Sequence, residues 1–568
     1  MGKHGLANQR KSGRRSGVIY TTLASAMVLV VASLTLTANQ SPPPAIAELA
    51  PSAIEQIKDP PPEQSSELGS GDGGGLGGLT TTTTSTTTTV LGGPTTTSTP
   101  PQTQPRVHRC VGQPPRQTED PQSPPCVTWT GTDNGGATSK GVTAGEIRVA
   151  VPTPDGVLSR HYTSLQAFFN QRYELYGRKL RLVAFKHKGD NVDCAAMKAD
   201  AINAAEQIDA FASLGYSIQR GAEGCYYDEL ARRGVMSMQG LSQGVSSGGE
   251  AHMERFAPYQ WSFFPSVDKI QRLLGEMICK NLAGRPPVHA DGAQRAASVR
   301  KFGILREIPR RGAPPLDTSI LDGALRSCGV TPVRIEQDTN VDDGARQALA
   351  RSAVIKFSDE NVTSVVCLCE AAFLGGLLIY GSIQGFFPEW ILQDYQGQDF
   401  EAAPAAWPSE DQKDNQLFGI RTWNKALPRA QTPYWMAQRE ADPTYPEGPY
   451  NNSTPYADLL VLGSGIQMAG PKLTPQAFQD GIYNASFPNP GCGGPPVYQG
   501  CVDFGPGNHT MVQDGTLIWF DPVAAPRDFD SETGPRRYGG FCYVENGRRY
   551  RPGQIPSGQL AFFQGPCA

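Results

Sequence analysis

Glu146-Ile147-Arg148-Val149-Ala150-Val151 is a short β-rich run that ends at Pro152. The chain after it alternates between two patterns, with apolar residues at helical spacing in some stretches and continuous β-rich runs in others. The helical stretches are 165–176 and 194–207, and the strand-like runs are 180–185 and 210–214. Strands separated by helices of this length predict a parallel sheet with helices on both faces.

The same alternation returns in a second region of the chain. Strand character recurs at 302–305, 330–335 and 362–368, with helical stretches at 318–327 and 345–356 between them. We therefore expect an α/β fold with more than one parallel sheet. In such sheets, ligands bind beyond the carboxyl ends of the strands.

Composition separates this body from the preceding residues. The chain contains 63 Gly and 48 Pro in 568 residues, about a fifth of the total against a usual share of roughly 12%. Much of this excess lies between Asn39 and Arg106, in proline triplets, a glycine run and a threonine tract. Such a segment buries too little apolar surface to fold. We predict a disordered stalk over 39–140, either an O-glycosylated spacer or an unmodified flexible linker.

The N-terminus carries a membrane signal. A basic tail, 1–16, precedes 17–38, a run of 22 uncharged residues that is long enough to cross a bilayer. Because positive flanks stay in the cytoplasm, this pattern predicts a single-pass anchor at the cell membrane, with a cytoplasmic N-terminus and an extracellular body. The triplet Ala45-Ile46-Ala47 keeps open a cleaved signal peptide, which would make the protein secreted.

The cysteines agree with export. All twelve follow the threonine tract, and an even count in an oxidising compartment predicts disulfides. Plausible local pairs are Cys110 with Cys126, Cys194 with Cys225, Cys492 with Cys501, and Cys542 with Cys567. The partners of Cys279, Cys328, Cys367 and Cys369 stay open. No C-x-x-C pair or regularly spaced histidine couple occurs, so we expect no metal site and no cofactor.

The charge pattern excludes one class of partner. The formal net charge is −4, and no long basic stripe follows the first 15 residues except 300–311. Nucleic-acid binding requires a concentrated basic face, so we predict no nucleic-acid partner.

Several short motifs resemble exported type I periplasmic-binding proteins of the branched-chain amino-acid-binding kind found in actinobacteria. The pieces, in the order of that family, are Asp133-Asn134-Gly135-Gly136, the run 141–149, Phe168-Phe169-Asn170, Tyr176-Gly177-Arg178-Lys179, 258–261, 264–266, 385–390, 465–470 and Phe520-Asp521-Pro522. The resemblance implies two α/β lobes, joined by three crossing segments, that close on a small molecule. We expect lobe 1 at 144–261 and 426–488, lobe 2 at 262–425 and 499–525, and a disulfide-pinned C-terminal extension at 526–568.

The resemblance also implies a ligand site. In that family the first lobe binds a ligand carboxylate with hydroxyls and backbone N–H groups, and the second lobe supplies an acid for the amine. The matching positions are Tyr216, Ser217, Ser242 and Gln243 in two loops, Asp155 after the first strand, and Asp394 with Tyr395 in the second lobe. Ordinary strand-end turns and a solvated Asp394 are the alternatives. Because Ile218-Gln219-Arg220 lacks hydroxyls, a larger polar ligand, a peptide-like molecule or a lost site also stays open.

Two motifs resemble other sites but lack the required context. Gly240-Leu241-Ser242-Gln243-Gly244 fits the nucleophile elbow G-x-S-x-G, yet the residues after it break helices, whereas the elbow needs a helix there. The segment 338–342 is similar to a calcium loop but lacks the glycine and glutamate that such a loop needs.

These patterns predict an extracellular, membrane-tethered solute-binding protein rather than an enzyme. Its partners would be a small polar ligand, amino-acid-like by resemblance, and an ABC permease or a membrane signalling protein. The alternatives are a cell-surface interaction or envelope protein that keeps the fold without a small-molecule site, and a serine hydrolase that uses Ser242.

Overall fold

The computed structural model describes most of the chain after residue 108, all within the second of two compact units, Ala53–Ala568. The described residues are 109–564 and Cys567, except 189–192, 216–222, 240–248, 309–315, 339–342, 395–396, 401, 426, 446–452, 490–499 and 525–538. The predicted basic tail, membrane segment 17–38 and stalk up to residue 108 lie outside them. None of the helices in the described ranges is both long and apolar enough to cross a membrane.

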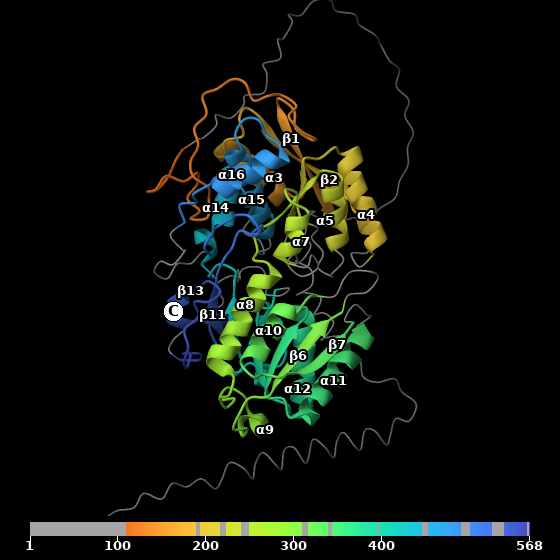
Figure 1. The fold of residues 1–568 in the computed structure, drawn as a ribbon, viewed down its shortest axis with the longest axis vertical. Coiled ribbons are helices and arrows are strands. Elements are labelled where there is room, and N and C mark those ends of the chain that lie inside the picture. Colours follow the sequence, from red (N-terminus) through yellow and green to blue (C-terminus); the bar gives the residue numbers. More distant parts are fainter. Residues whose placement is uncertain are drawn as a thin grey trace, which may run out of the picture. The chain divides into compact units, whose positions relative to one another are not determined.

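Lobe 1 contains a five-stranded parallel sheet. Its strands are β1 (Glu146–Thr153), β2 (Lys179–Lys186), β3 (Ala212–Ser213), β4 (Met236–Gln239) and β5 (Gln260–Ser262), in the order β2-β1-β3-β4-β5. The helices between them are α3 (Arg160–Arg172), α4 (Cys194–Ile202), α5 (Glu223–Arg232) and α7 (Glu250–Arg255), and a π-helical turn (Asn203–Gln207) extends α4. Figure 1 shows α3 on one side of β1 and α4 with α5 on the other. The predicted alternation in this region is confirmed.

Three later helices complete lobe 1. They are α14 (Pro433–Ala441), α15 (Ser453–Ala469) and α16 (Pro475–Asn484). Both α14 and α15 contact α3. Glycines let these helices approach closely, because a Cβ on Gly465 would lie 2.0 Å from the Phe478 ring and one on Gly463 would lie 2.9 Å from Phe169.

Lobe 2 contains a larger mixed sheet. Its parallel strands are β6 (Phe302–Glu307), β7 (Val333–Gln337), β8 (Ser364–Leu368), β9 (Glu389–Leu392) and β10 (Leu417–Arg421). Its antiparallel strands are β11 (Gly515–Asp521), β12 (Gly540–Tyr543) and β13 (Arg549–Tyr550). The order is β12-β11-β10-β9-β8-β6-β7, and β13 pairs with β11. The predicted strands at 302–305, 330–335 and 362–368 are confirmed as β6, β7 and β8, with shifted ends.

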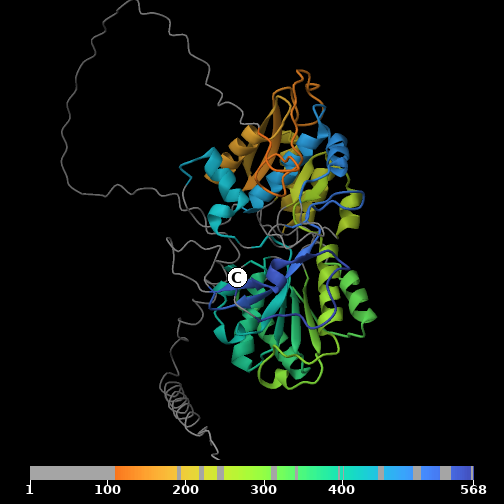
Figure 2. The same ribbon diagram turned by 90° about the vertical axis from the view of Figure 1, so that its left-hand side faces the viewer.

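The helices of lobe 2 lie on both sides of its sheet, as the two views in Figures 1 and 2 show. They are α8 (Val267–Met277), α9 (Gly292–Arg295), α10 (Ser319–Ser327), α11 (Asp343–Asp359), α12 (Ala371–Gln384) and α13 (Ala402–Ala406). A π-helical turn (Ile278–Leu282) extends α8, and short 3-10 turns lie at Glu410–Gln412, Arg429–Gln431 and Val544–Gly547.

Local sequence signals explain several helix starts. Asp193 precedes α4, and its carboxylate accepts hydrogen bonds from the N–H groups of Ala195 and Ala196, at 2.9 and 3.2 Å. Thr474 precedes α16 and accepts from the N–H of Ala477 at 3.0 Å. Such caps satisfy backbone donors that have no partner inside the helix, so they fix where the helix begins.

The C-terminal tail belongs to the sheet of lobe 2. Its strand β12 pairs with β11, so that Trp519 lies opposite Cys542, and Cys542 is bonded to Cys567 as predicted. Phe562 packs on Phe418, with ring centroids 4.7 Å apart. The described part of the predicted extension is therefore an integral edge of lobe 2.

The segment 109–140, just before β1, is folded, so the predicted stalk ends earlier than residue 140. Residues 109–140 pack against lobe 1, whereas composition placed them in a disordered stalk. Asp120 is buried and accepts a hydrogen bond from the hydroxyl of Tyr456 on α15, at 2.7 Å. Cys110 is bonded to Cys126, and the side chain of Gln467 donates to the carbonyl of Pro125 at 2.7 Å. The prediction was wrong here because a disulfide and buried polar contacts order a segment of low apolar content.

The disulfides agree with the sequence where they can be compared. The pairs Cys110–Cys126, Cys194–Cys225 and Cys542–Cys567 are confirmed. The four cysteines left open pair as Cys279–Cys328 and Cys367–Cys369. Cys501 is disulfide-bonded, but its predicted partner Cys492 lies outside the described residues.

Three segments connect the lobes, and we name them crossing 1 (263–266), crossing 2 (422–432) and crossing 3 (485–514) from the elements that flank them. Crossings 1 and 3 run side by side, because the N–H of Val512 donates to the carbonyl of Phe263 at 3.1 Å. In crossing 2, Trp423 stacks on Phe264 with ring centroids 4.7 Å apart. The described parts of the three crossings therefore pack together.

Candidate functional site at the carboxyl ends of the two sheets

The topology indicates where a ligand would bind. The strand order reverses between β1 and β3 in lobe 1 and between β6 and β8 in lobe 2. Ligands bind doubly wound sheets beyond the carboxyl ends of the strands at such switch points. Strand β5 ends directly before crossing 1, and β10 ends directly before crossing 2. The carboxyl edges of both sheets therefore border the crossings, and they form the candidate site.

The structure describes two of the seven predicted site residues. Asp155 lies two residues beyond β1, exposed, and its carboxylate accepts from the N–H of Val157 at 3.0 Å. Asp394 lies two residues beyond β9 and is 6% exposed. The other five, Tyr216, Ser217, Ser242, Gln243 and Tyr395, lie outside the described residues, as do most of the G-x-S-x-G and calcium-like motifs.

At the carboxyl edge of lobe 1, the buried acid Asp458 is hydrogen-bonded to the start of the predicted first ligand loop. The N–H of Gly215, just beyond β3, donates to Oδ2 of Asp458 at 3.2 Å. Asp458 comes from α15 and is 3% exposed, and its Oδ1 has no hydrogen-bond partner among the described residues. Burial raises the pKa of Asp458 well above its usual value. Burial, followed by the charge of Asp458, also raises the pKa of Tyr162.

Sequence reasoning missed Asp458. The signal was available, because this aspartate is the only charged residue in the apolar helix 453–469. Acids are rarely buried without a partner, so a lone acid in such a helix is a candidate for function.

Uncharged amides continue the edge of lobe 1. Gln239 ends β4, and its Nε2 donates to Oε1 of Gln260 at 3.2 Å, while its own Oε1 has no partner among the described residues. Gln260 in turn donates to Asp228 at 2.8 Å, and the imidazole of His252 contacts the same carboxylate oxygen at 2.8 Å. The ionic groups Asp228 and His252 therefore contact each other and, through Asp228, the Gln260 amide, and among the described residues neither is hydrogen-bonded to Gln239.

At the edge of lobe 2, two acids form a pair. The hydroxyl of Thr422 donates to Asp394, and the carboxyl group of Asp394 adjoins that of Asp399. Burial and then the neighbouring Asp399 raise the pKa of Asp394 well above its usual value. Burial also raises the pKa of Asp399, although Arg421 opposes that shift. Two adjoining carboxyl groups do not both ionise readily, so this pair retains a proton to higher pH than an isolated aspartate does.

Two glutamines connect this acid pair to the end of β8. The side-chain amides of Gln393 and Gln398 both donate to the carbonyl of Cys367, at 3.1 and 2.9 Å. Gln398 also donates to the carbonyl of Cys369 at 2.7 Å. The Cys367–Cys369 disulfide closes this strand end into a small ring, so the backbone at the lobe 2 switch point is fixed from both sides.

Arg549, from the C-terminal tail, braces the same edge. Its side chain is 2% exposed and pairs with Asp514 of crossing 3 at 2.8 Å. It also donates to the carbonyls of Thr422 and Trp423 in crossing 2, at 2.6 and 2.9 Å. One tail residue therefore holds two of the crossings and positions Thr422 beside Asp394.

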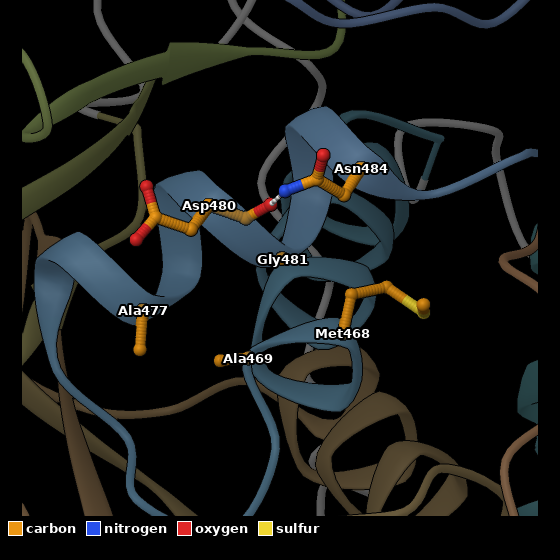
Figure 3. A pocket seen from close by; sticks show the side chains of 6 residues that line it. All are labelled: Met468, Ala469, Ala477, Asp480, Gly481 and Asn484. Atoms are coloured by element: carbon orange, nitrogen blue, oxygen red, sulfur yellow. Dashed lines mark hydrogen bonds between the residues drawn. The ribbon is translucent and has the colours of Figure 1, made fainter.

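A surface pocket of about 450 Å³ lies elsewhere on lobe 1, between α15 and α16. It is lined by Met468, Ala469, Ala477, Asp480, Gly481 and Asn484. Figure 3 shows Asn484 and Asp480 on α16 across from Met468 on α15, with the Asn484 amide directed at the backbone of Asp480. The pocket lies roughly 15 Å along α15 from Asp458. With one exposed acid as its only charged group, it contains no set of converging polar groups.

The described residues offer no free metal ligands in a cluster. Asp521, Cys542 and Cys567 come close enough to share an ion, but the two sulfur atoms are bonded to each other. Disulfide sulfur is not a thiolate ligand, so this group does not form a metal site.

No family model and no curated protein matches the sequence. Solved structures do. A solute-binding protein of an ABC transporter from R. palustris, in complex with 4-hydroxybenzoate, is 11% identical with a TM-score of 0.48, and the match covers 72% of this chain and 98% of that one. The chain resembles ABC-transporter solute-binding proteins.

Two further solved structures are similar to this chain, and their names refer to different ligands. A branched-chain amino-acid ABC transporter protein from Thermus thermophilus, with bound valine, is 15% identical with a TM-score of 0.45, covering 68% of this chain and 97% of that one. A fatty-acid ABC transporter substrate-binding protein from Thermomonospora curvata is 14% identical with a TM-score of 0.47, covering 74% and 97%.

Proposed function

We propose that the chain is an extracellular solute-binding protein that binds a small polar ligand between its two lobes. One observation carries this proposal: two doubly wound sheets present their carboxyl edges at the same three crossings, and buried polar groups lie at both edges. A site of this kind binds without covalent chemistry, so no catalytic step is proposed.

The tether and the partners belong to the same proposal. The uncharged segment 17–38 anchors the chain in the cell membrane with its N-terminus in the cytoplasm, or is cleaved to release a secreted body. The bound ligand is delivered to an ABC permease or presented to a membrane signalling partner. Protease treatment of intact cells tests the orientation, because an extracellular body is digested while a cytoplasmic one is protected.

Thermal unfolding against a metabolite library tests ligand binding. A ligand at about 100 times its dissociation constant adds about 2.7 kcal/mol of stability. The resemblance to branched-chain amino-acid binders places amino-acid-like compounds in this library, with Asp155, Tyr216, Ser217, Ser242, Gln243, Asp394 and Tyr395 as proposed contacts. If no compound in a broad library stabilises the protein, the solute-binding proposal is wrong.

One observation favours a second function, a cell-surface interaction protein that keeps the fold without a small-molecule site. Gln122, from the segment before β1, donates to the carbonyl of Gly500 in crossing 3 at 3.0 Å and accepts from Asn424 in crossing 2 at 3.1 Å. Together with Arg549, it links two crossings that a closing protein must bend. Small-angle scattering with and without a stabilising compound distinguishes the solute-binding protein from the interaction protein. Only a solute-binding protein that closes on its ligand becomes more compact.

A further inference from the structure

The carboxylate of Asp458 accepts a backbone hydrogen bond at the carboxyl edge of lobe 1. Backbone N–H groups at the ends of parallel strands bind anions well because they donate without a charge of their own. The N–H of Gly215, at the switch point of lobe 1, is such a donor, and the resemblance implies that this loop receives a ligand carboxylate. In this chain the N–H donates instead to the protein's own carboxylate, at 3.2 Å.

Asp458 keeps one acceptor available. Asp458 is only 3% exposed. Its Oδ1 is nevertheless without a hydrogen-bond partner among the described residues. The arginines of the neighbouring helix α3 are engaged elsewhere, because Arg160 pairs with Asp442 at 2.8 Å and Arg172 pairs with Glu440 at 2.7 Å. A buried acid without a cation is costly unless another group supplies a donor.

Lobe 2 also presents acid. Asp394 and Asp399 adjoin beyond the end of β9, and both acids are buried. The guanidinium of Arg421 donates to the carbonyls of Asn424 and Asp399. Both edges therefore offer acceptors, and the cations described at the lobe 2 edge, Arg421 and Arg549, are bonded to groups of the protein itself.

We infer that the ligand carries a cationic nitrogen toward each lobe, as an alkyl diamine or a guanidinium-bearing amine does, and no carboxylate toward lobe 1. This inference rests on the proposed solute-binding function. An ammonium group would give Oδ1 of Asp458 a charge-assisted hydrogen bond and would favour the ionised form of this buried acid. A ligand carboxylate would instead have to compete with Asp458 for the N–H of Gly215.

The test is calorimetric titration of the full chain with four probes: 1,4-diaminobutane, n-butylamine, leucine and 4-hydroxybenzoate. The diamine is expected to bind at least tenfold more tightly than the monoamine, with no measurable binding of the two carboxylates. Asp458→Asn should lower the affinity for the diamine at least tenfold and that for the monoamine less. Asp480→Asn, an exposed acid on α16, is the control that should change neither affinity.

The outcomes separate the inference from the function on which it rests. Binding of leucine or 4-hydroxybenzoate but not of the diamine overturns the inference and leaves solute binding intact. Diamine binding that Asp458→Asn leaves unchanged overturns the role of lobe 1. If neither these probes nor the wider library bind, solute binding fails and the inference fails with it. Circular dichroism of each variant confirms that a lost affinity does not reflect unfolding.

Discussion

The two carboxyl edges have the same topology but are built differently. In lobe 1 one acid, Asp458, comes from a helix and is held by a single backbone N–H. In lobe 2 an acid pair is backed by Arg421 and braced by Arg549, which belongs to the C-terminal tail. Strand order therefore determines where a site lies, whereas helices and the tail determine its charge. Four changes test this difference.

Arg549→Ala should have the largest effect, because it removes the brace of lobe 2. The change leaves Asp514 buried without its cation, and breaking a buried pair costs about 3–5 kcal/mol. Chemical denaturation measures the loss in free energy of unfolding. The adjacent Arg548, whose pair with Glu545 is exposed, is the matched control, and Arg548→Ala should change the free energy of unfolding by less than about 1 kcal/mol. If both variants lose the same free energy of unfolding, Arg549 does not stabilise lobe 2 through its buried pair with Asp514.

Asp394→Asn tests the acid pair itself. A hydrogen bond to a charged group such as an ammonium contributes about 1.5–3 kcal/mol, so the affinity for an amine ligand that contacts Asp394 should fall at least about tenfold. Titration calorimetry measures this change, and Asp414→Asn, an exposed acid of lobe 2, is the control. Unchanged affinity in Asp394→Asn would remove this residue from the site.

Asp458→Asn should stabilise the ligand-free protein. The pKa of Asp458 is raised in the fold from the usual 3.8, so the folded chain binds this proton more tightly than the unfolded chain. The free energy of unfolding therefore decreases as pH rises above about 4 and through the folded pKa. Asn cannot bind or release this proton, so the variant should be more stable than the parent protein at pH 7 and should differ little from it below pH 4. A gain that is independent of pH would contradict an isolated buried carboxyl group.

Gln122→Ala should have the smallest effect, because it removes neutral hydrogen bonds between crossings 2 and 3. Its loss leaves the buried carbonyl of Gly500 and the amide of Asn424 each short of one partner, which should cost about 1–2 kcal/mol. Gln113→Ala, at an exposed position of the same segment, is the control. If Gln122→Ala also increases the compaction on ligand binding, the segment before β1 restrains the crossings.

Local pattern predicted much of the fold. The run 146–151 lies within β1, and 165–176 overlaps α3, because the period of apolar residues reports which face of an element is buried. The boundary of the stalk failed at 109–140 for a related reason. Composition predicts disorder where apolar residues are few, but the Cys110–Cys126 disulfide and the buried Asp120 order this segment by other means.

The candidate site was predicted only in part. The family resemblance implies a ligand role for Asp394, and the structure shows this residue buried beside Asp399. Asp458 was missed because the helix that carries it reads as apolar core, and nothing in its own pattern points to the loop after β3. Arg549 was missed because the sequence predicts its segment, 526–568, as a C-terminal extension outside both lobes.

The sequence by itself determined the alternation of strands and helices, and with it the doubly wound sheets, an architecture in which ligands usually bind at the carboxyl edges. These features depend on neighbouring residues, which share one element whatever the rest of the chain does. Only the tertiary structure decided which charges lie at those edges. The contact of Gly215 with Asp458 spans 243 positions and that of Gln122 with Gly500 spans 378. Such proximity arises only when the lobes and crossings have packed, so no local pattern encodes it.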